Sequence, residues 1–127
     1  MPQRILVIDD EHPTLELVRL TLASEPYEVL LADSGALGLQ MVREKNPDLV
    51  ICDIAMPDVN GYHVIDTIRK EQDHHIPILV LTAFPEGVLD RDFGEKDADL
   101  YLTKPVAPAQ LVAFVSKLLL PPAQANP

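Results

Sequence analysis

The chain has 127 residues, of which 47% are hydrophobic, and it carries a formal net charge of −10 at pH 7. This length and apolar content suit one globular domain with a buried core rather than a disordered chain. The acid excess argues against direct binding of nucleic acid, whose phosphates it would repel. No apolar run has the length of a membrane span, so no membrane contact is expected.

The single cysteine, Cys52, offers no disulfide framework, which suits a reducing cytoplasm. We therefore expect a cytoplasmic location. The composition changes only at the C-terminal end, where the stretch PPAQANP cannot extend a helix. We expect one domain at residues 1–120, followed by a Pro/Ala-rich tail or the start of a linker at residues 121–127.

Short apolar runs alternate with helix-like segments along the chain. Five runs predict strands, at residues 5–9, 29–32, 49–53, 78–82 and 99–103. Four amphipathic segments predict helices, at residues 13–24, 34–45, 61–70 and 108–120. The strand runs are continuous rather than alternating, so we expect both faces of the strands to be buried. The pattern predicts a doubly wound α/β fold, in which a parallel sheet carries helices on both faces.

A further helical segment, at residues 86–96, has weak helix-forming features. Gly87 and Gly94 each cost roughly 1 kcal/mol relative to alanine inside a helix. The preceding Pro85 disfavours a helical conformation at Phe84. We expect a short or irregular helix here, and the alternative is an ordinary helix stabilised by tertiary packing.

Polar residues follow the apolar runs at their carboxyl ends. Asp9 and Asp10 follow the first run, Asp53 ends the third, Thr82 ends the fourth and Lys104 follows the fifth. In an open parallel sheet these ends meet at one crevice, where ligands bind. Carboxylates packed this closely repel one another unless a cation compensates, and Mg²⁺ prefers oxygen ligands. With two carboxylates for the metal, Asp53 is left to attack a phosphoryl group and form an acyl phosphate.

Two further groups complete this chemistry. Lys104 supplies a fixed positive charge, and Thr82 can donate a hydrogen bond to a phosphoryl oxygen. Ala83 is small and leaves room for the group. The crevice is therefore expected to receive a phosphoryl group beside a metal ion.

The stretches VIDDE, DLVICDIAMPDVNG, LTA and YLTKP follow one another in an order and spacing that resemble the receiver domain of two-component response regulators. The resemblance covers residues 4 to about 120. It implies a flavodoxin-like fold whose five-stranded parallel sheet has the order 2-1-3-4-5. It also implies a phospho-aspartate switch that takes a phosphoryl group, with Mg²⁺, from the phosphohistidine of a sensor histidine kinase or a histidine phosphotransfer protein.

The resemblance implies roles for individual residues. Asp53 would be the phosphoacceptor, Lys104 would bind the phosphoryl group, and Thr82 and Tyr101 would couple phosphorylation to a change in shape. The metal ligands would be Asp9, Asp10, Asp53 and the backbone carbonyl of Ala55. The Lys104–Pro105 peptide bond would be cis.

The resemblance also implies how the signal would be used. The protein would catalyse only its own phosphorylation and dephosphorylation, so it would not be an enzyme with a separate substrate. Its change in shape would regulate a downstream output domain or protein. A phosphorylation-dependent homodimer is a further option.

Three other functions are alternatives to this one. Phosphatases with an aspartyl nucleophile place a second aspartate two residues later, where this chain has Ala55. A flavin or nucleotide binder of the same fold would need a Ser/Thr/Gly-rich loop after the first strand, and here the loop reads DDEHP, which would repel phosphate without a cation. A docking module that works without phosphorylation is the remaining alternative, and the complete set of acid, hydroxyl and lysine argues against it.

Several nearby residues also have ordinary explanations. Tyr101 fits simple strand packing as well as a coupling role. Cys52 should point away from the acidic crevice and serve as a small core residue. His74 and His75 lie in the loop before the fourth strand and lack partners at metal-ligand spacing, so a solvated loop is expected. His12 is expected to lie near the acidic site and is assigned no role.

Overall fold

The computed structural model describes residues 2–83 and 98–119. Within these ranges, five parallel strands form one sheet in the order β2-β1-β3-β4-β5. The strands are β1 (Gln3–Ile8), β2 (Tyr27–Ala32), β3 (Leu49–Asp53), β4 (Ile78–Thr82) and β5 (Leu100–Thr103). The predicted strand order is confirmed.

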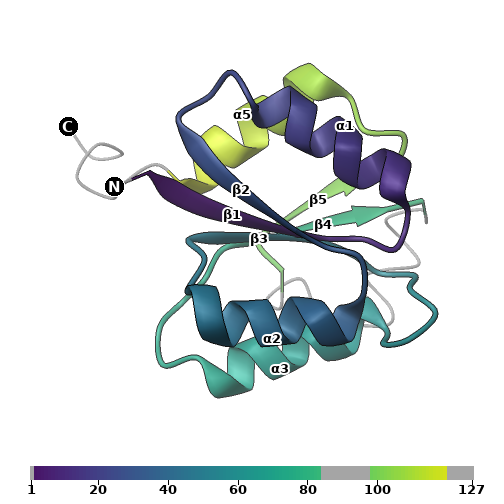
Figure 1. Ribbon diagram of the computed structural model, residues 1–127, viewed down its shortest axis with the longest axis vertical. Helices are drawn as coiled ribbons and strands as arrows, with labels where there is room; N and C mark the ends of the chain where they lie inside the picture. Colours follow the sequence, from purple (N-terminus) through teal and green to yellow (C-terminus); the bar gives the residue numbers. More distant parts are fainter. Residues whose placement is uncertain (1, 84–97, 120–127) are drawn as a thin grey trace.

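Helices cover both faces of this sheet. They are α1 (His12–Leu22), α2 (Gly35–Lys45), α3 (Gly61–Glu71) and α5 (Pro108–Leu119). In Figure 1, α1 and α5 lie on one face of the sheet, and α2 and α3 lie on the other. The segment 86–96 and the tail 121–127 lie outside the described residues. No helix in the described part of the chain combines the length and the apolar character needed to cross a membrane.

The core consists of two apolar layers, one on each face of the sheet. Alternation along β1 sends Ile5 and Val7 into the layer beneath α1 and α5, and Leu6 and Ile8 into the layer beneath α2 and α3. All residues of β3 and β4 are buried. Strands β2 and β5 are only partly buried, so the expectation of full burial is wrong for them. Each lies at an edge of the described sheet and has a neighbouring strand on one side only.

Side chains at the helix starts explain where α2 and α3 begin. The Ser34 hydroxyl accepts a hydrogen bond from the Leu37 N–H at 3.1 Å and so caps the start of α2. Asn60 caps α3 in the same way, because its side-chain oxygen accepts from the Tyr62 N–H at 2.7 Å. At the other end of α2, Asn46 adopts a left-handed conformation with φ of 48° and ends the helix.

Helix α3 begins against the end of strand β3, and Gly61 makes this contact possible. The Gly61 N–H donates to the Ile54 carbonyl at 2.8 Å. A Cβ atom at this position would lie 2.2 Å from the Asp53 carbonyl oxygen and 2.6 Å from the Ile54 Cα. Only glycine therefore allows the helix to start this close to the last residue of the strand.

Replacing Gly61 by alanine should destabilise the fold more than replacing Gly38 by alanine. Gly61→Ala is expected to lower the free energy of unfolding by about 3 kcal/mol, since the new methyl group meets backbone atoms. In Gly38→Ala the methyl group meets only the Ile8 side chain, which can shift. The better helix propensity of alanine also offsets roughly 1 kcal/mol of the cost of this contact. Urea unfolding of the two variants would test this ranking, and an equal loss would contradict it.

Candidate functional site

The carboxyl ends of the strands surround a crevice of about 250 Å³. Its lining residues are Asp10, Glu11, Asp53, Ala55, Ala83 and Lys104. They come from four segments of the chain that are far apart in sequence and that the parallel sheet brings to one edge. The crevice forms where the sequence predicts it.

Three carboxylates meet in this crevice. Asp9, Asp10 and Asp53 each place a carboxylate oxygen within 4.8 Å of the other two. Asp9 and Asp53 are buried, and Asp10 is partly buried. The buried Oδ1 atom of Asp10 has no hydrogen-bond partner. Three converging oxygen donors with one buried oxygen unpaired fit a hard divalent cation such as Mg²⁺.

The ammonium group of Lys104 lies against these acids. Its Nζ is 2.9 Å from Asp9 Oδ2, in an ion pair with a fully buried carboxylate. The same Nζ lies 3.5 Å from Asp53 Oδ2 and 2.7 Å from Glu11 Oε1. Burial works against the charge of Lys104, yet the hydrogen bond to Glu11 and the nearby aspartates raise the pKa of the ammonium above its ordinary value.

A backbone hydrogen bond fixes the position of Lys104. Its N–H donates to the Thr82 carbonyl at 2.7 Å, so the residue is tied to the end of β4. The Lys104–Pro105 peptide bond is cis, which confirms the prediction. The lysine side chain is 14% exposed and extends into the crevice.

The carboxyl group of Asp53 has an unusual environment. Burial raises its pKa to about 6, the negative charge of Asp9 adds to this effect, and Lys104 acts against it. The Ala55 N–H lies 3.4 Å from Asp53 Oδ1 and gives only weak support. The group is still mostly ionised at neutral pH, and an ionised carboxylate facing a crevice can act as a nucleophile.

Thr82 and Tyr101 lie on neighbouring strands. Thr82 is buried at the end of β4 and pairs in register with Thr103, while Tyr101 pairs with Val80. Because side chains alternate along a strand, Thr82 and Tyr101 point to the same face of the sheet. Tyr101 is partly buried there and packs against the apolar layer beneath α2 and α3.

Glu11 belongs to the crevice although the sequence analysis gave it no role. It is the N-cap residue of α1, but its side chain makes no capping hydrogen bond. The side chain instead reaches Lys104, which lowers the pKa of Glu11. The signal in the sequence was the third acid of the stretch DDE.

Asp58 is a second residue that the sequence analysis did not single out. Its two carboxylate oxygens accept hydrogen bonds from the N–H groups of Gly35 and Ala36, at 3.1 and 3.0 Å. The N–H groups of α2, Ala36 first, lower the pKa of this carboxyl. Asp58 therefore ties the loop that follows Asp53 to the start of α2.

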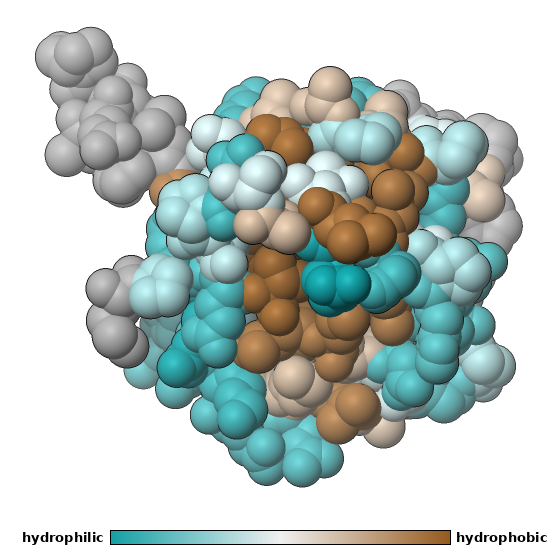
Figure 2. All heavy atoms as spheres, turned by 45° about the horizontal axis from the view of Figure 1, so that its top comes forward, coloured by the Kyte–Doolittle hydropathy of each residue, from teal (hydrophilic) through white to brown (hydrophobic). Residues whose placement is uncertain are grey.

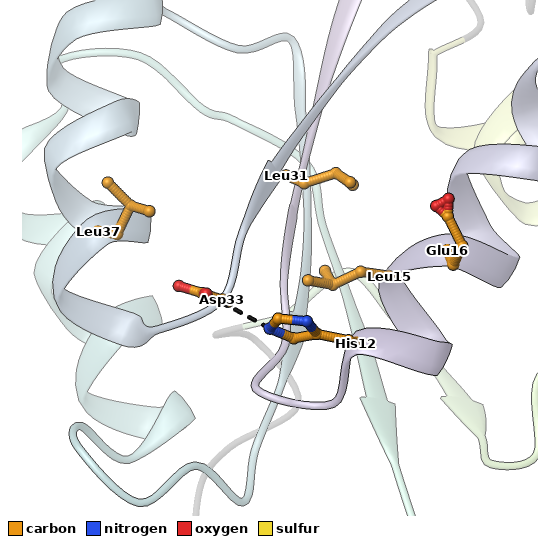
Figure 3. Close-up of a pocket in the computed structure, with 6 residues that line it drawn as sticks. All are labelled: His12, Leu15, Glu16, Leu31, Asp33 and Leu37. Atoms are coloured by element: carbon orange, nitrogen blue, oxygen red, sulfur yellow. Dashed lines mark ion pairs between the residues drawn. The ribbon is translucent and has the colours of Figure 1, made fainter.

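A separate groove of about 490 Å³ lies between α1, β2 and the start of α2 (Figure 3). Its walls include Leu15, Leu31 and Leu37. The face of the molecule drawn in Figure 2 also has a broad apolar area, with hydrophilic side chains lying across it. Figure 3 shows His12 turned toward Asp33, and its Nε2 lies 3.4 Å from Asp33 Oδ2. His12 is not among the residues that line the acidic crevice.

Cys52, His74 and His75 lie outside the acidic crevice. Cys52 is buried in the layer beneath α2 and α3. His74 and His75 are exposed in the loop before β4, and neither belongs to a metal-binding group among residues 2–83 and 98–119. Both histidines form ion pairs with acids: His74 Nδ1 lies 3.0 Å from Asp73 Oδ1, and His75 Nε2 lies 2.9 Å from Asp99 Oδ1.

Replacing Asp53 by asparagine should stabilise the metal-free protein in a pH-dependent way. The folded pKa of about 6 exceeds the unfolded value of roughly 4. The stability that this raised pKa contributes is therefore fully present below pH 4 and is lost as the pH rises through 6. Asp53→Asn should therefore raise the free energy of unfolding by on the order of 1 kcal/mol at pH 7.5 and by little at pH 4. The gain at pH 7.5 is this small because water at the crevice screens part of the repulsion.

Urea unfolding of wild type and variant between pH 4 and 8, without divalent cations, would measure this difference. Asp66→Asn is the matched control, because Asp66 lies on α3 with 56% of its side chain exposed. A gain in Asp53→Asn that is constant across this pH range would contradict the prediction.

Comparison with known proteins agrees with this geometry. The family described as "Response regulator receiver domain" matches residues 5–116. The chain is 40% identical over 118 residues to ycf27 of Pyropia yezoensis, named "Probable transcriptional regulator", which covers 92% of this chain and 47% of the relative. It is 40% identical over 120 residues to the response regulator MprA of Mycobacterium sp. (strain KMS), covering 94% of this chain and 51% of the relative. The chain thus spans about half the length of the curated relatives it matches.

Solved structures show the same similarity. The response regulator TrrA of Thermotoga maritima, in complex with Mg(2+)-BeF, has a TM-score of 0.82 and 38% identity and covers 92% of this chain and 99% of its own. The chemotaxis protein CheY4 of Vibrio cholerae has a TM-score of 0.85 and 27% identity and covers 94% of this chain and all of its own, 100%. With the family pattern matched over most of its length, the chain belongs to the response regulator receiver domain family.

Proposed function

We propose that the chain is a phospho-aspartate switch that accepts a phosphoryl group on Asp53 from the phosphohistidine of a histidine kinase or a histidine phosphotransfer protein. The observation that carries this proposal is the convergence of Asp53, two further aspartates and Lys104 in one crevice. Membership of the receiver family supports a signalling role rather than turnover of a separate substrate.

The transfer needs one new bond and one broken bond. A carboxylate oxygen of Asp53 attacks the phosphorus, an O–P bond forms, and the P–N bond to the donor histidine breaks, leaving the electron pair on nitrogen. Lys104 balances negative charge on the phosphoryl oxygens, and the Thr82 hydroxyl donates to one of them. Histidine regains a proton from solvent.

The same crevice suits a magnesium ion. The ligands would be Asp9, Asp10, Asp53 and the backbone carbonyl of Ala55. A bound ion would neutralise carboxylate and phosphoryl charge during the transfer. The unpaired Asp10 oxygen supports this ligand set, and so does the relative TrrA, whose structure contains Mg(2+)-BeF.

The output of the switch would follow from Thr82 and Tyr101. A phosphoryl group adds charge and acceptor oxygens at Asp53. Thr82 would move toward it, and Tyr101, on the same face of the sheet, would follow into the vacated space. This change would regulate an output domain or partner in the cytoplasm, and a phosphorylated homodimer is one form it could take. The relatives of twice this length include named response regulators and transcriptional regulators.

Phosphorylation should add one phosphate, and only at Asp53. Incubation with acetyl phosphate and Mg²⁺ is expected to give a single mass increase in the intact protein. Asp53→Asn should abolish it, and Asp10→Ala should reduce it together with Mg²⁺ affinity, because the ion loses a ligand. Asp66→Asn, which removes an exposed acid on α3, is the control and should react like wild type.

Label that persists in Asp53→Asn would show that the acceptor lies elsewhere, and a wild type that takes no label would favour the phosphorylation-independent docking module.

Thr82→Ala should separate phosphorylation from the change in shape. The variant is expected to bind beryllofluoride, an analogue of the phosphoryl group, because Asp53 and Lys104 remain. The NMR signals of Tyr101 should shift less than in wild type, since the hydroxyl that responds to the phosphoryl group is missing. Serine at position 82 keeps the hydroxyl and should restore the shift. Equal shifts in Thr82→Ala and wild type would rule out this coupling.

A further inference from the structure

The ammonium of Lys104 is bound more closely by Glu11 than by the proposed phosphoacceptor. The distance from Lys104 Nζ to Glu11 Oε1 is 2.7 Å, and the distance to Asp53 Oδ2 is 3.5 Å. The contact with Glu11 is also a hydrogen bond, which is the stronger kind of ion pair. In this state the lysine is therefore held toward the α1 side of the crevice.

Glu11 is placed to hold the lysine without taking part in the acid cluster. Its backbone N–H donates to Asp9 Oδ1 at 2.9 Å, so its main chain is fixed. Its side chain is 60% exposed, whereas the Asp9 side chain is fully buried, so Glu11 lies at the mouth of the crevice. The metal-binding group found among residues 2–83 and 98–119 contains three aspartates and not Glu11. A metal ion would therefore not release this contact by binding Glu11 itself.

We propose that Glu11 is a positioning residue that acts as a latch on Lys104 and restrains phosphorylation of Asp53. The proposal rests on the proposed function. For Lys104 to bind a phosphoryl oxygen, it must exchange the Glu11 carboxylate for that oxygen. The broken hydrogen bond raises the barrier to transfer, and the transition state gains less from the lysine than it would without a competitor. Phosphorylation in turn frees Glu11 at the start of α1.

The rate of phosphorylation by acetyl phosphate with Mg²⁺, followed by intact mass, tests the latch. Glu11→Gln should react roughly twofold to fivefold faster than wild type, the effect of losing one partly exposed ion pair. Glu11→Asp keeps the charge but is one methylene shorter, so it should lose the contact and react faster as well. Glu16→Gln is the matched control and should react like wild type, because Glu16 lies on the same helix and pairs with Arg19 instead.

The variants separate a contact from a simple charge effect. If Glu11→Gln is faster and Glu11→Asp is not, the charge alone matters and the latch is wrong. If both are slower, Glu11 assists Lys104 and the latch is also wrong. In a Lys104→Gln background the acceleration by Glu11→Gln should disappear, and its full persistence there would overturn the proposal.

An NMR measurement keeps the proposal testable apart from phosphorylation. The ammonium signal of Lys104 in the unphosphorylated protein should shift and exchange faster with water in Glu11→Gln, since a hydrogen bond is lost. An unchanged ammonium signal would overturn the latch even if phosphorylation occurs. A wild type that takes no label would instead refute the proposed function, whatever the ammonium signal shows.

Discussion

The structure of the crevice depends on one ammonium group, that of Lys104, which balances the negative charge of the surrounding acids. Lys104 lies within 3.5 Å of carboxylate oxygens from Asp9, Glu11 and Asp53, and two of these acids are buried. Buried charges of one sign raise each other's energy, and removing their partner leaves an uncompensated charge that costs several kcal/mol. One positive charge is not enough for all of them, and the pKa of Asp53 stays raised, first by burial of its carboxyl group and then by repulsion from Asp9. The crevice is thus prepared for a second cation.

Contacts with the backbone of β3 and α2 hold the residues around this charge cluster in place. Gly61 lets α3 begin against the carbonyl of Asp53, and Asp58 binds the first N–H groups of α2. The loop that joins Asp53 to α3 also carries Ala55, which lines the crevice. Two helices on one face of the sheet are therefore anchored to the loop that follows Asp53. A displacement of that loop on phosphorylation would be resisted at both ends, which favours transmission through β4 and β5 instead.

Hydrophobic runs and turn residues predicted most of the fold, because continuous apolar strands separated by helices leave few ways to build a sheet. The main residues of the crevice were predictable for the same reason, since strand ends in a parallel sheet converge. The exposure of the edge strands β2 and β5 was missed, because a run of apolar letters does not reveal which strands lie at an edge. Glu11 and Asp58 were missed because their roles depend on partners 93 and 22 to 23 residues away in the chain. A local sequence pattern does not reveal partners this far apart in the chain.

The same repulsion that weakens the metal-free protein would give the proposed switch its energy. Any ligand that binds only the folded state and relieves buried charge will stabilise that state by its own binding free energy. A metal ion and a phosphoryl group, bound as proposed, would act on the same carboxylates, so their effects on the fold would be coupled rather than independent. Lys104 connects this coupling to α1 through Glu11 and to the end of β4 through its own N–H. A change in charge at Asp53 would therefore be felt both at the start of α1 and at the end of β4 through this one residue.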